Sequence, residues 1–378
     1  MIRIPFNRPF ATGEEINHIR AAIATPKFSG DGSFSARCHA LLEQSLGIQK
    51  ALLTTSCTHA LEMAALLLDI GPGDEVIVPS FTFPSAANAF VLRGARPIFV
   101  DVRPDTLNID EAQIDQRITE RTKAIFLVHY AGVGCEMDTV MTIARRHAVA
   151  VVEDNAHGLY GKYRGRYLGT FGELATLSFH ETKNFSCGEG GALLINDAQF
   201  NERAEILREK GTDRSRFFRG EVDKYTWVDI GSSYLPSDLL AAFLQAQLEH
   251  RDQIQSRRRE IWEAYSRELA SWAEATGVRL PITPSECEQS YHMFYVIMPS
   301  LESRQALISH LAGCGILAVF HYLPLHLSPM GLRFGGQQGA CPVTEALSDR
   351  LLRLPFFTGM SSSEQNQVID AVRAFAVK

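Results

Sequence analysis

One lysine in this sequence lies where its amine could become reactive. Lys183 follows an apolar run at 174–179 and precedes a glycine cluster at 188–191. A short apolar run of this kind indicates a buried strand, so Lys183 is expected in a loop at the end of that strand. An amine becomes a free nucleophile near neutral pH when it is desolvated or lies beside another cation. A lone lysine is usually a solvated surface charge, so the interpretation depends on its neighbours.

The first neighbour is Asp154, which follows a second apolar run at 149–152. An acid at this place could pair with the ring nitrogen of pyridoxal 5′-phosphate (PLP). At about 4 Å and an effective dielectric near 20, the attraction is roughly 4 kcal/mol. It would keep the nitrogen protonated, which makes the ring an electron sink. Alternatively, Asp154 caps a nearby loop. His157 could lie near the phenolic oxygen of the ring or serve as a structural histidine.

The second neighbour is a helix that the sequence predicts to begin at Ser56-Cys57-Thr58. Its hydroxyls, its unpaired N–H groups and the positive end of its dipole suit a phosphate. Simple capping of the helix is the alternative. Ser178 could donate to the same phosphate, and Phe83 could stack on the pyridine ring or belong to the core.

The composition is that of an ordinary globular protein. The chain has 378 residues, 46% hydrophobic and 21% charged, and is long enough for two domains. A net charge of -6 argues against a nucleic-acid partner. Seven scattered cysteines without CxxC spacing argue against disulfides and a zinc site, and no metal site is expected. No signal peptide or membrane span is recognised, so a cytoplasmic enzyme is expected.

The fold class predicted from the patterning is α/β. Apolar runs at 75–79, 97–101, 124–128, 149–152, 174–179 and 192–195 alternate with helical patterns. They predict a mostly parallel sheet with helices on both faces, whose ligands bind at the carboxyl ends of the strands. One long helix is expected from Ser237-Asp238 to about residue 269. A strand at 293–297 then opens a smaller domain, which divides the chain into 1–250 and 251–378.

These segments together resemble the DegT/DnrJ/EryC1/StrS family of sugar aminotransferases, which are fold-type I PLP enzymes. The motifs lie at 29–32, 55–58, 72–77, 79–83, 153–154 and 178–183, followed by 324–326 and 352–355. The resemblance implies a large domain with a mostly parallel sheet and a smaller α+β C-terminal domain. It implies Lys183 bound covalently to PLP, Asp154 on the pyridine nitrogen and Phe83 on the ring. It also implies a phosphate site formed by Ser56, Cys57, Thr58 and Ser178.

Further segments, such as 128–133, 223–227 and 320–326, resemble one group within the family. Its members convert TDP-4-oxo-6-deoxy-D-glucose and L-glutamate into TDP-4-amino-4,6-dideoxy-D-galactose for enterobacterial common antigen. Two departures from the wider family stand out. Ser233 and Leu235 replace the usual Asn and Arg, and His157 takes a position that is often Gln.

The resemblance also implies a homodimer with shared active sites. The basic stretch 214–224 could then reach the nucleotide diphosphate in the partner's site, or be a solvated loop. The residues expected to bind the substrate are Asp31, Arg219, Lys224 and His326. Alternatives are an aminotransferase for another nucleotide keto sugar, a PLP sugar dehydratase or a non-catalytic regulator. Since such dehydratases carry histidine in place of the lysine, Lys183 favours amino transfer.

Overall fold

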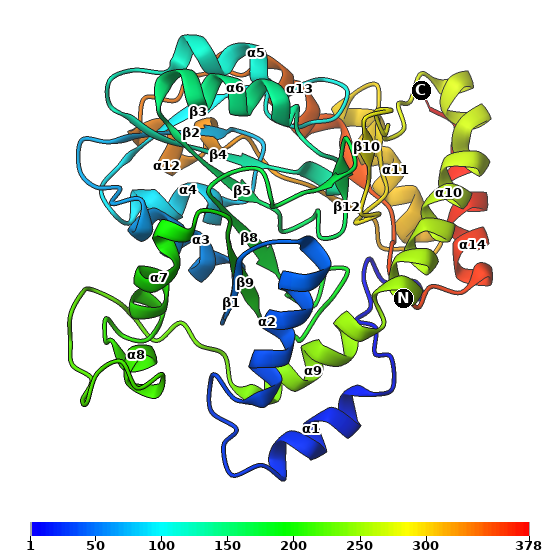
Figure 1. Cartoon of the computed structure of the whole chain (residues 1–378). Coiled ribbons are helices and arrows are strands. Elements are labelled where there is room, and N and C mark those ends of the chain that lie inside the picture. Colours follow the sequence, from blue (N-terminus) through cyan, green and yellow to red (C-terminus); the bar gives the residue numbers. More distant parts are fainter. Residues whose placement is uncertain (1, 378) are drawn as a thin grey trace.

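A seven-stranded sheet forms the centre of the computed structural model, which describes residues 2–377 (Figure 1). Met1 and Lys378 lie outside the described residues. In spatial order the strands are β1 (Lys50–Thr54), β9 (Gly191–Ile195), β8 (Leu174–Ser178), β5 (Ala150–Asp154), β4 (Thr122–Val128), β2 (Glu75–Pro79) and β3 (Arg96–Val100). Only β9 runs against its neighbours, so the predicted mostly parallel α/β sheet is confirmed.

All six predicted runs are strands, with ends that differ by up to two residues. The seventh strand, β1, was not predicted. It pairs with β9 along its whole length, from Lys50 opposite Ile195 to Thr54 opposite Gly191. The ends of β5 and β8 matter most for the site, because Asp154 is the last residue of β5 and Ser178 the last of β8.

Helices cover both faces of the sheet. α3 (Cys57–Leu67) and α4 (Pro84–Val91) pack on one face, and α6 (Met137–His147) packs on the other (Figure 1). Buried side chains such as Leu61 and Phe90 on the first face, and Val140 on the second, form the two cores. α2 (Ser33–Leu46) and α9 (Asp238–Glu249) complete a third core beside β1. A sheet buried on both faces explains why its strands are nearly continuous apolar runs.

The predicted single helix over 238–269 is wrong. The chain forms α9 and then α10 (Arg251–Thr276), with a break at His250, whose φ of −100° and ψ of 23° are not helical. The break allows α9 to pack on α1 (Glu15–Ile23) and α2 while α10 packs on the C-terminal helix α14 (Ser362–Arg373). Ser237 makes no side-chain cap. The carboxylate of Asp238 instead accepts hydrogen bonds from the N–H groups of Phe34 and Ser35, at 3.1 and 2.7 Å.

A second, three-stranded sheet lies in the C-terminal part. It has the order β11 (Tyr295–Ile297), β13 (Leu351–Arg353) and β12 (Val319–Phe320), all antiparallel. Its core is shared with α10, α11 (Leu301–Gly313) and α14 (Ser362–Arg373), and it includes Ile4 from the N-terminal segment. We propose a domain boundary near residue 250, with the segment around Ile4 packed on the C-terminal domain.

The remaining elements are shorter or peripheral. The helices are α1 (Glu15–Ile23), α5 (Glu111–Ile114), α7 (Asn201–Arg208), α8 (Arg214–Phe218), α12 (Pro329–Arg333) and α13 (Pro342–Arg350). The strands β6 (Lys162–Tyr163), β7 (Arg166–Tyr167) and β10 (Cys287–Glu288) form a small third sheet. Within residues 2–377, no helix is both long and apolar enough to span a bilayer.

Candidate active site

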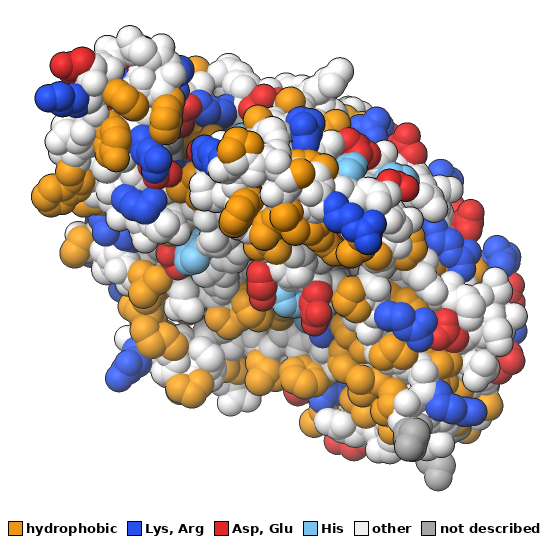
Figure 2. All heavy atoms as spheres, turned by 90° about the horizontal axis from the view of Figure 1, so that it is seen from below, with side chains coloured by type: hydrophobic (Ala, Val, Ile, Leu, Met, Phe, Trp, Pro, Cys, Tyr) orange, Lys and Arg blue, Asp and Glu red, His pale blue; other side chains and the backbone are white. Residues whose placement is uncertain are grey.

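A cavity of about 730 Å³ lies where β5 and β8 end. Its wall combines residues of the large sheet, the start of α3 and the C-terminal sheet. The face seen in Figure 2 is hollowed near its middle, with hydrophobic side chains around the hollow and acidic and histidine side chains within it. Eight predicted residues line the cavity: Ser56, Cys57, Thr58, Phe83, Asp154, His157, Ser178 and Lys183.

Lys183 reaches the cavity from the turn that follows β8. Its backbone N–H donates to the carbonyl of His180 at 2.9 Å, which closes the turn. The next residue, Asn184, is buried and donates to the carbonyl of Ser290 at 2.7 Å, which anchors the loop to the C-terminal part. Burial lowers the pKa of the Lys183 amine, while Cys57 and Asp154 oppose this effect. The lowered pKa shifts the equilibrium toward the neutral amine, which is the nucleophilic form.

Asp154 projects into the same cavity, and its carboxylate lacks a cation. Within residues 2–377, the only hydrogen bond that the carboxylate of Asp154 accepts comes from the N–H of Ala156, at 3.1 Å. No Lys, Arg or His side chain of residues 2–377 forms an ion pair with it. Burial raises the pKa of Asp154, although Ala156, Lys183 and His129 oppose this. A protonated pyridine nitrogen would supply the missing positive charge.

The preceding residue, Glu153, points to the opposite face of the sheet. Its carboxylate accepts the N–H groups of Gly169, Phe171 and Gly172 at 2.6–2.8 Å and pairs with His129 at 2.8 Å. The alternation of side chains along β5 thus separates a structural acid from an acid that faces the cavity.

The start of α3 forms the polar end of the cavity. Ser56 caps the helix, since its Oγ accepts the N–H of His59 at 3.1 Å. Thr58 shares a hydrogen bond of 2.8 Å with the hydroxyl of Ser85, a cavity residue that the sequence reasoning missed. Gly191 lies against this turn, and a Cβ there would approach the Cys57 nitrogen to 2.4 Å. Hydroxyls and helix N–H groups so arranged suit a phosphate.

Aromatic rings line the middle of the cavity. Phe83 precedes α4 and keeps 57% of its surface exposed, with its ring centroid 6.3 Å from that of Tyr322. The imidazole of His157 stacks on that of His292 and lies 3.5 Å from the Tyr322 hydroxyl. Its Nδ1 is buried and has no hydrogen-bond partner among the described residues. An exposed ring and an unpaired buried nitrogen are what a bound aromatic cofactor would satisfy.

The C-terminal part contributes residues that the sequence reasoning did not identify as site residues. His292, His321, Tyr322 and Arg353 all line the cavity. His321 stacks on Tyr322 at 3.6 Å and shares a 2.7 Å hydrogen bond with the hydroxyl of buried Tyr130. The sequence signals for His321, Tyr322 and Arg353 were the segments 320–326 and 352–355, which entered only through family resemblance, and His292 had none.

The four residues predicted to bind the substrate do not line this cavity. His326 is fully buried, and its two ring nitrogens engage Ser80 at 2.6 Å and Glu345 at 3.0 Å, so its contact with substrate stays a prediction without support from this geometry. Asp31 forms an ion pair with buried Arg208.

The other two lie in the part of the chain around α8. Arg219 pairs with Glu205 at 2.7 Å and with Glu221 at 2.6 Å, and Lys224 is exposed in the loop that follows. α8 and this loop project from the body of the molecule at the left of Figure 1. Neither residue lines the cavity.

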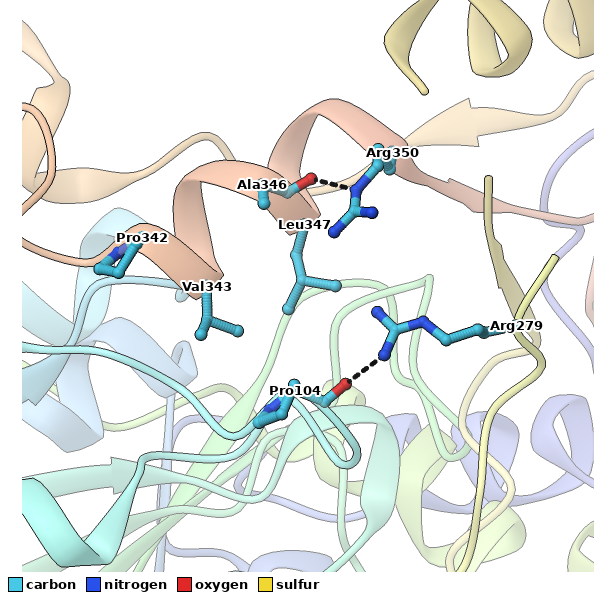
Figure 3. A pocket seen from close by; sticks show the side chains of 7 residues that line it. All are labelled: Pro104, Arg279, Pro342, Val343, Ala346, Leu347 and Arg350. Atoms are coloured by element: carbon cyan, nitrogen blue, oxygen red, sulfur yellow. Dashed lines mark hydrogen bonds between the residues drawn. The ribbon is translucent and has the colours of Figure 1, made fainter. Parts of the chain in front are cut away.

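A second hollow, of about 380 Å³, lies between α13 and the segments that carry Pro104 and Arg279 (Figure 3). Its two arginines already donate to backbone carbonyls, Arg279 to Pro104 at 3.1 Å and Arg350 to Ala346 at 2.8 Å. No carboxylate, histidine, cysteine or hydroxyl side chain lines it. This hollow therefore lacks the groups for acid–base or nucleophilic chemistry.

Comparisons with known proteins agree with this geometry. The model of the DegT/DnrJ/EryC1/StrS aminotransferase family matches residues 10–373. GDP-perosamine synthase of Escherichia coli O157:H7 is 31% identical over 373 residues, which cover 98% of each chain. The aminotransferase TlmJ from Streptoalloteichus hindustanus is 31% identical, with a TM-score of 0.89 over 99% of this chain and 98% of that one. The PLP form of Spr1654 from Streptococcus pneumoniae is 26% identical, with a TM-score of 0.90 over 98% of this chain and 97% of that one.

Proposed function

Since the chain belongs to the DegT/DnrJ/EryC1/StrS family and is a PLP-dependent sugar aminotransferase, we propose that it aminates C4 of TDP-4-oxo-6-deoxy-D-glucose. L-Glutamate is the proposed amino donor. The products are TDP-4-amino-4,6-dideoxy-D-galactose and 2-oxoglutarate. The observation that carries the proposal is that a half-buried amine, Lys183, and a buried carboxylate without an ion-pair partner, Asp154, share one cavity.

Each proposed role follows from the position of the residue. PLP, when bound, supplies an electron-withdrawing ring that stabilises negative charge on the carbon beside the amino group. Asp154 holds the proton on the pyridine nitrogen, because its buried carboxylate has no other cation to pair with. Lys183 holds the cofactor covalently and then moves the proton to and from the substrate carbon. The lowered pKa of Lys183 makes its amine release a proton more readily than a solvated lysine does.

The remaining cofactor contacts are proposed on the same basis. Ser56, Cys57, Thr58 and Ser178 hold the phosphate at the start of α3. Phe83 stacks on one face of the ring, which accounts for an apolar side chain that is 57% exposed. His157 lies at the phenolic oxygen, where its unpaired Nδ1 could find a partner.

The nucleotide sugar is the finer part of the proposal. Support for a nucleotide-linked acceptor comes from the relative named GDP-perosamine synthase, which covers the whole chain. The TDP group and the 4-keto position rest on the resemblance of segments such as 223–227 and 320–326 to one group within the family. A role in enterobacterial common antigen and a cytoplasmic location belong to the same proposal.

The last part of the proposal is a homodimer with shared active sites. α8 and the segment after it expose large apolar side chains, with Phe218 of α8 66% and Trp227 77% exposed. Such side chains in one protruding segment favour burial against a second copy. In that arrangement Arg219 and Lys224 would approach the diphosphate in the partner's site.

The visible spectrum of the purified holoenzyme tests the proposal. L-Glutamate should bleach the yellow absorbance of the bound cofactor, and TDP-4-oxo-6-deoxy-D-glucose should restore it. Bleaching that only another nucleotide keto sugar reverses would refute the proposed acceptor and keep the amino transfer. A protein that stays colourless when PLP is supplied would refute the roles of Lys183 and Asp154 and favour a non-catalytic regulator.

A further inference from the structure

The cavity contains a positive charge that the proposed cofactor contacts do not use. Arg353 ends β13, the middle strand of the C-terminal sheet, and lines the cavity together with Lys183. These two residues are the only Lys or Arg on the cavity wall in the described chain. Lys183 lies in the turn after β8 of the large sheet, and Arg353 lies in the C-terminal sheet.

The guanidinium of Arg353 is held in place by neutral groups. Its Nε and Nη2 donate to the carbonyl of Phe320 at 3.2 and 3.0 Å. Its plane lies over the ring of Phe6, 4.6 Å from the centroid. A guanidinium has five N–H donors, so the bonds to Phe320 leave three of them free.

No carboxylate of residues 2–377 forms an ion pair with Arg353. This sets it apart from Arg208, a buried arginine that pairs with Asp31. Burial lowers the pKa of Arg353, and the arginine in turn lowers the pKa of Lys183, so the two groups share one electrostatic environment. A partly buried cation without a counter-ion is costly unless an anion completes it.

We infer that Arg353 binds the α-carboxylate of the amino-acid donor and thereby selects α-amino acids as donors. The inference rests on the proposed amino transfer. The donor nitrogen must react beside Lys183, and its α-carboxylate lies only two bonds from that nitrogen. A cation on the same cavity wall is therefore in the right region for it. A guanidinium edge with free donors matches the two oxygens of a carboxylate.

The nucleotide sugar is the other anionic ligand of the site, but its charge lies on the diphosphate. The diphosphate is separated from the reacting carbon by the sugar ring. The donor carboxylate is thus the anion that must come close to Lys183 in every turnover.

The donor half-reaction tests this inference and requires no sugar. The rate of cofactor bleaching by L-glutamate is measured for the wild-type holoenzyme and for Arg353→Gln, with Arg353→Lys as the conservative variant. The glutamate concentration for half-maximal rate should rise roughly 10- to 100-fold in Arg353→Gln, the size expected for a charge-assisted pair. Arg353→Lys should recover part of the loss, because it keeps the charge without the planar fork.

The choice between L-alanine and L-alaninamide is the sharper readout. The wild type should prefer the carboxylate, and Arg353→Gln should lose that preference. Arg350→Gln is the matched control, because Arg350 also donates to a single backbone carbonyl but lies outside the cavity. An unchanged preference in Arg353→Gln, or an equal loss in the control, would overturn the inference.

A binding measurement separates this role from a general loss of structure. 2-Oxoglutarate should bind the cofactor-free wild type more tightly than cofactor-free Arg353→Gln in titration calorimetry, while both proteins melt at similar temperatures. If only the sugar half-reaction suffers in Arg353→Gln, Arg353 serves the diphosphate and the inference fails. The donor half-reaction uses no sugar, so its result does not depend on the identity of the acceptor. The proposed acceptor and the proposed role of Arg353 can therefore be refuted independently.

Discussion

The imidazole of His157 stacks on that of His292, with ring centroids 4.2 Å apart and planes 16° from parallel. His157 follows β5 of the large sheet, whereas His292 precedes β11 of the C-terminal sheet. Asn184, next to Lys183, shares a 2.9 Å hydrogen bond with the Nδ1 of His292. This histidine pair therefore connects the lysine loop, the end of β5 and the C-terminal part at the wall of the cavity.

The stability of the cofactor-free protein should decrease as the pH is lowered. Burial lowers the pKa of His157 and of His292 well below the ordinary value of 6.5. The folded state therefore keeps both rings neutral, and the unfolded state binds more protons once the pH falls below about 6.5. Stability is complete above that pH and is lost as the pH falls toward the folded-state pKa values. The raised pKa of Asp154 has the opposite effect on stability. Its contribution is present at low pH and is lost as the pH rises through the folded-state pKa of Asp154.

Calorimetric melting between pH 8 and pH 5 measures this effect. His292→Gln should melt with a shallower pH dependence than the wild type. His147→Gln removes a surface histidine that pairs with Asp115 and serves as the control. Equal slopes for all three proteins would contradict the assignment of the pH dependence to the buried pair.

Lys183→Ala should abolish amino transfer and covalent attachment of PLP. Proton transfer by a positioned side chain accounts for roughly 10²- to 10⁴-fold in rate, and the attachment depends on the amine itself. Borohydride reduction followed by mass spectrometry should add the mass of the cofactor to the wild type and not to Lys183→Ala. Lys162→Ala, which removes a lysine paired with Glu288 outside the cavity, should keep the added mass. Substantial turnover by Lys183→Ala would refute its role.

Asp154→Asn should separate catalysis from stability. The substitution keeps the shape and removes the charge, so the ring nitrogen would lose an interaction of roughly 4 kcal/mol, or about three orders of magnitude in kcat. The cofactor-free variant should melt no lower than the wild type, because the carboxylate is buried without a cation. Glu153→Gln should instead leave kcat nearly unchanged and destabilise the fold by about 1–3 kcal/mol. The reason is that the carboxylate of Glu153 accepts hydrogen bonds from three backbone N–H groups. Similar effects of the two variants on kcat would contradict the division of roles along β5.

Ser56→Ala should weaken both a helix and a binding site. Loss of the cap on α3 costs about 1 kcal/mol of folding stability, and loss of the hydroxyl should weaken PLP binding. Ser361→Ala removes the cap of α14, whose Oγ accepts the N–H of Glu364, far from the cavity. The two variants should lose similar stability in urea unfolding. Fluorescence titration with PLP should show weaker binding only for Ser56→Ala; equal affinities would exclude Ser56 from the phosphate site.

Local patterns in the sequence were enough to predict six of the seven strands of the large sheet, all except β1. Buried strands require apolar runs, and the polar residues that end them, Asp154 and Ser178, must lie at one edge of a parallel sheet. The start of α3 followed in the same way from the hydroxyls of Ser56 and Thr58, because capping is a local interaction. The fold class and the residues of the large sheet that face the cavity were therefore within reach of the sequence alone.

The tertiary structure decided what depends on contacts between distant segments. The break at His250, the burial of His326 and the place of Arg353 on the same cavity wall as Lys183 have no local signal. Each depends on how the C-terminal sheet packs against the end of the large one. Periodicity and capping are properties of neighbours in the chain, whereas the pairing or isolation of a charge is a property of the packed fold.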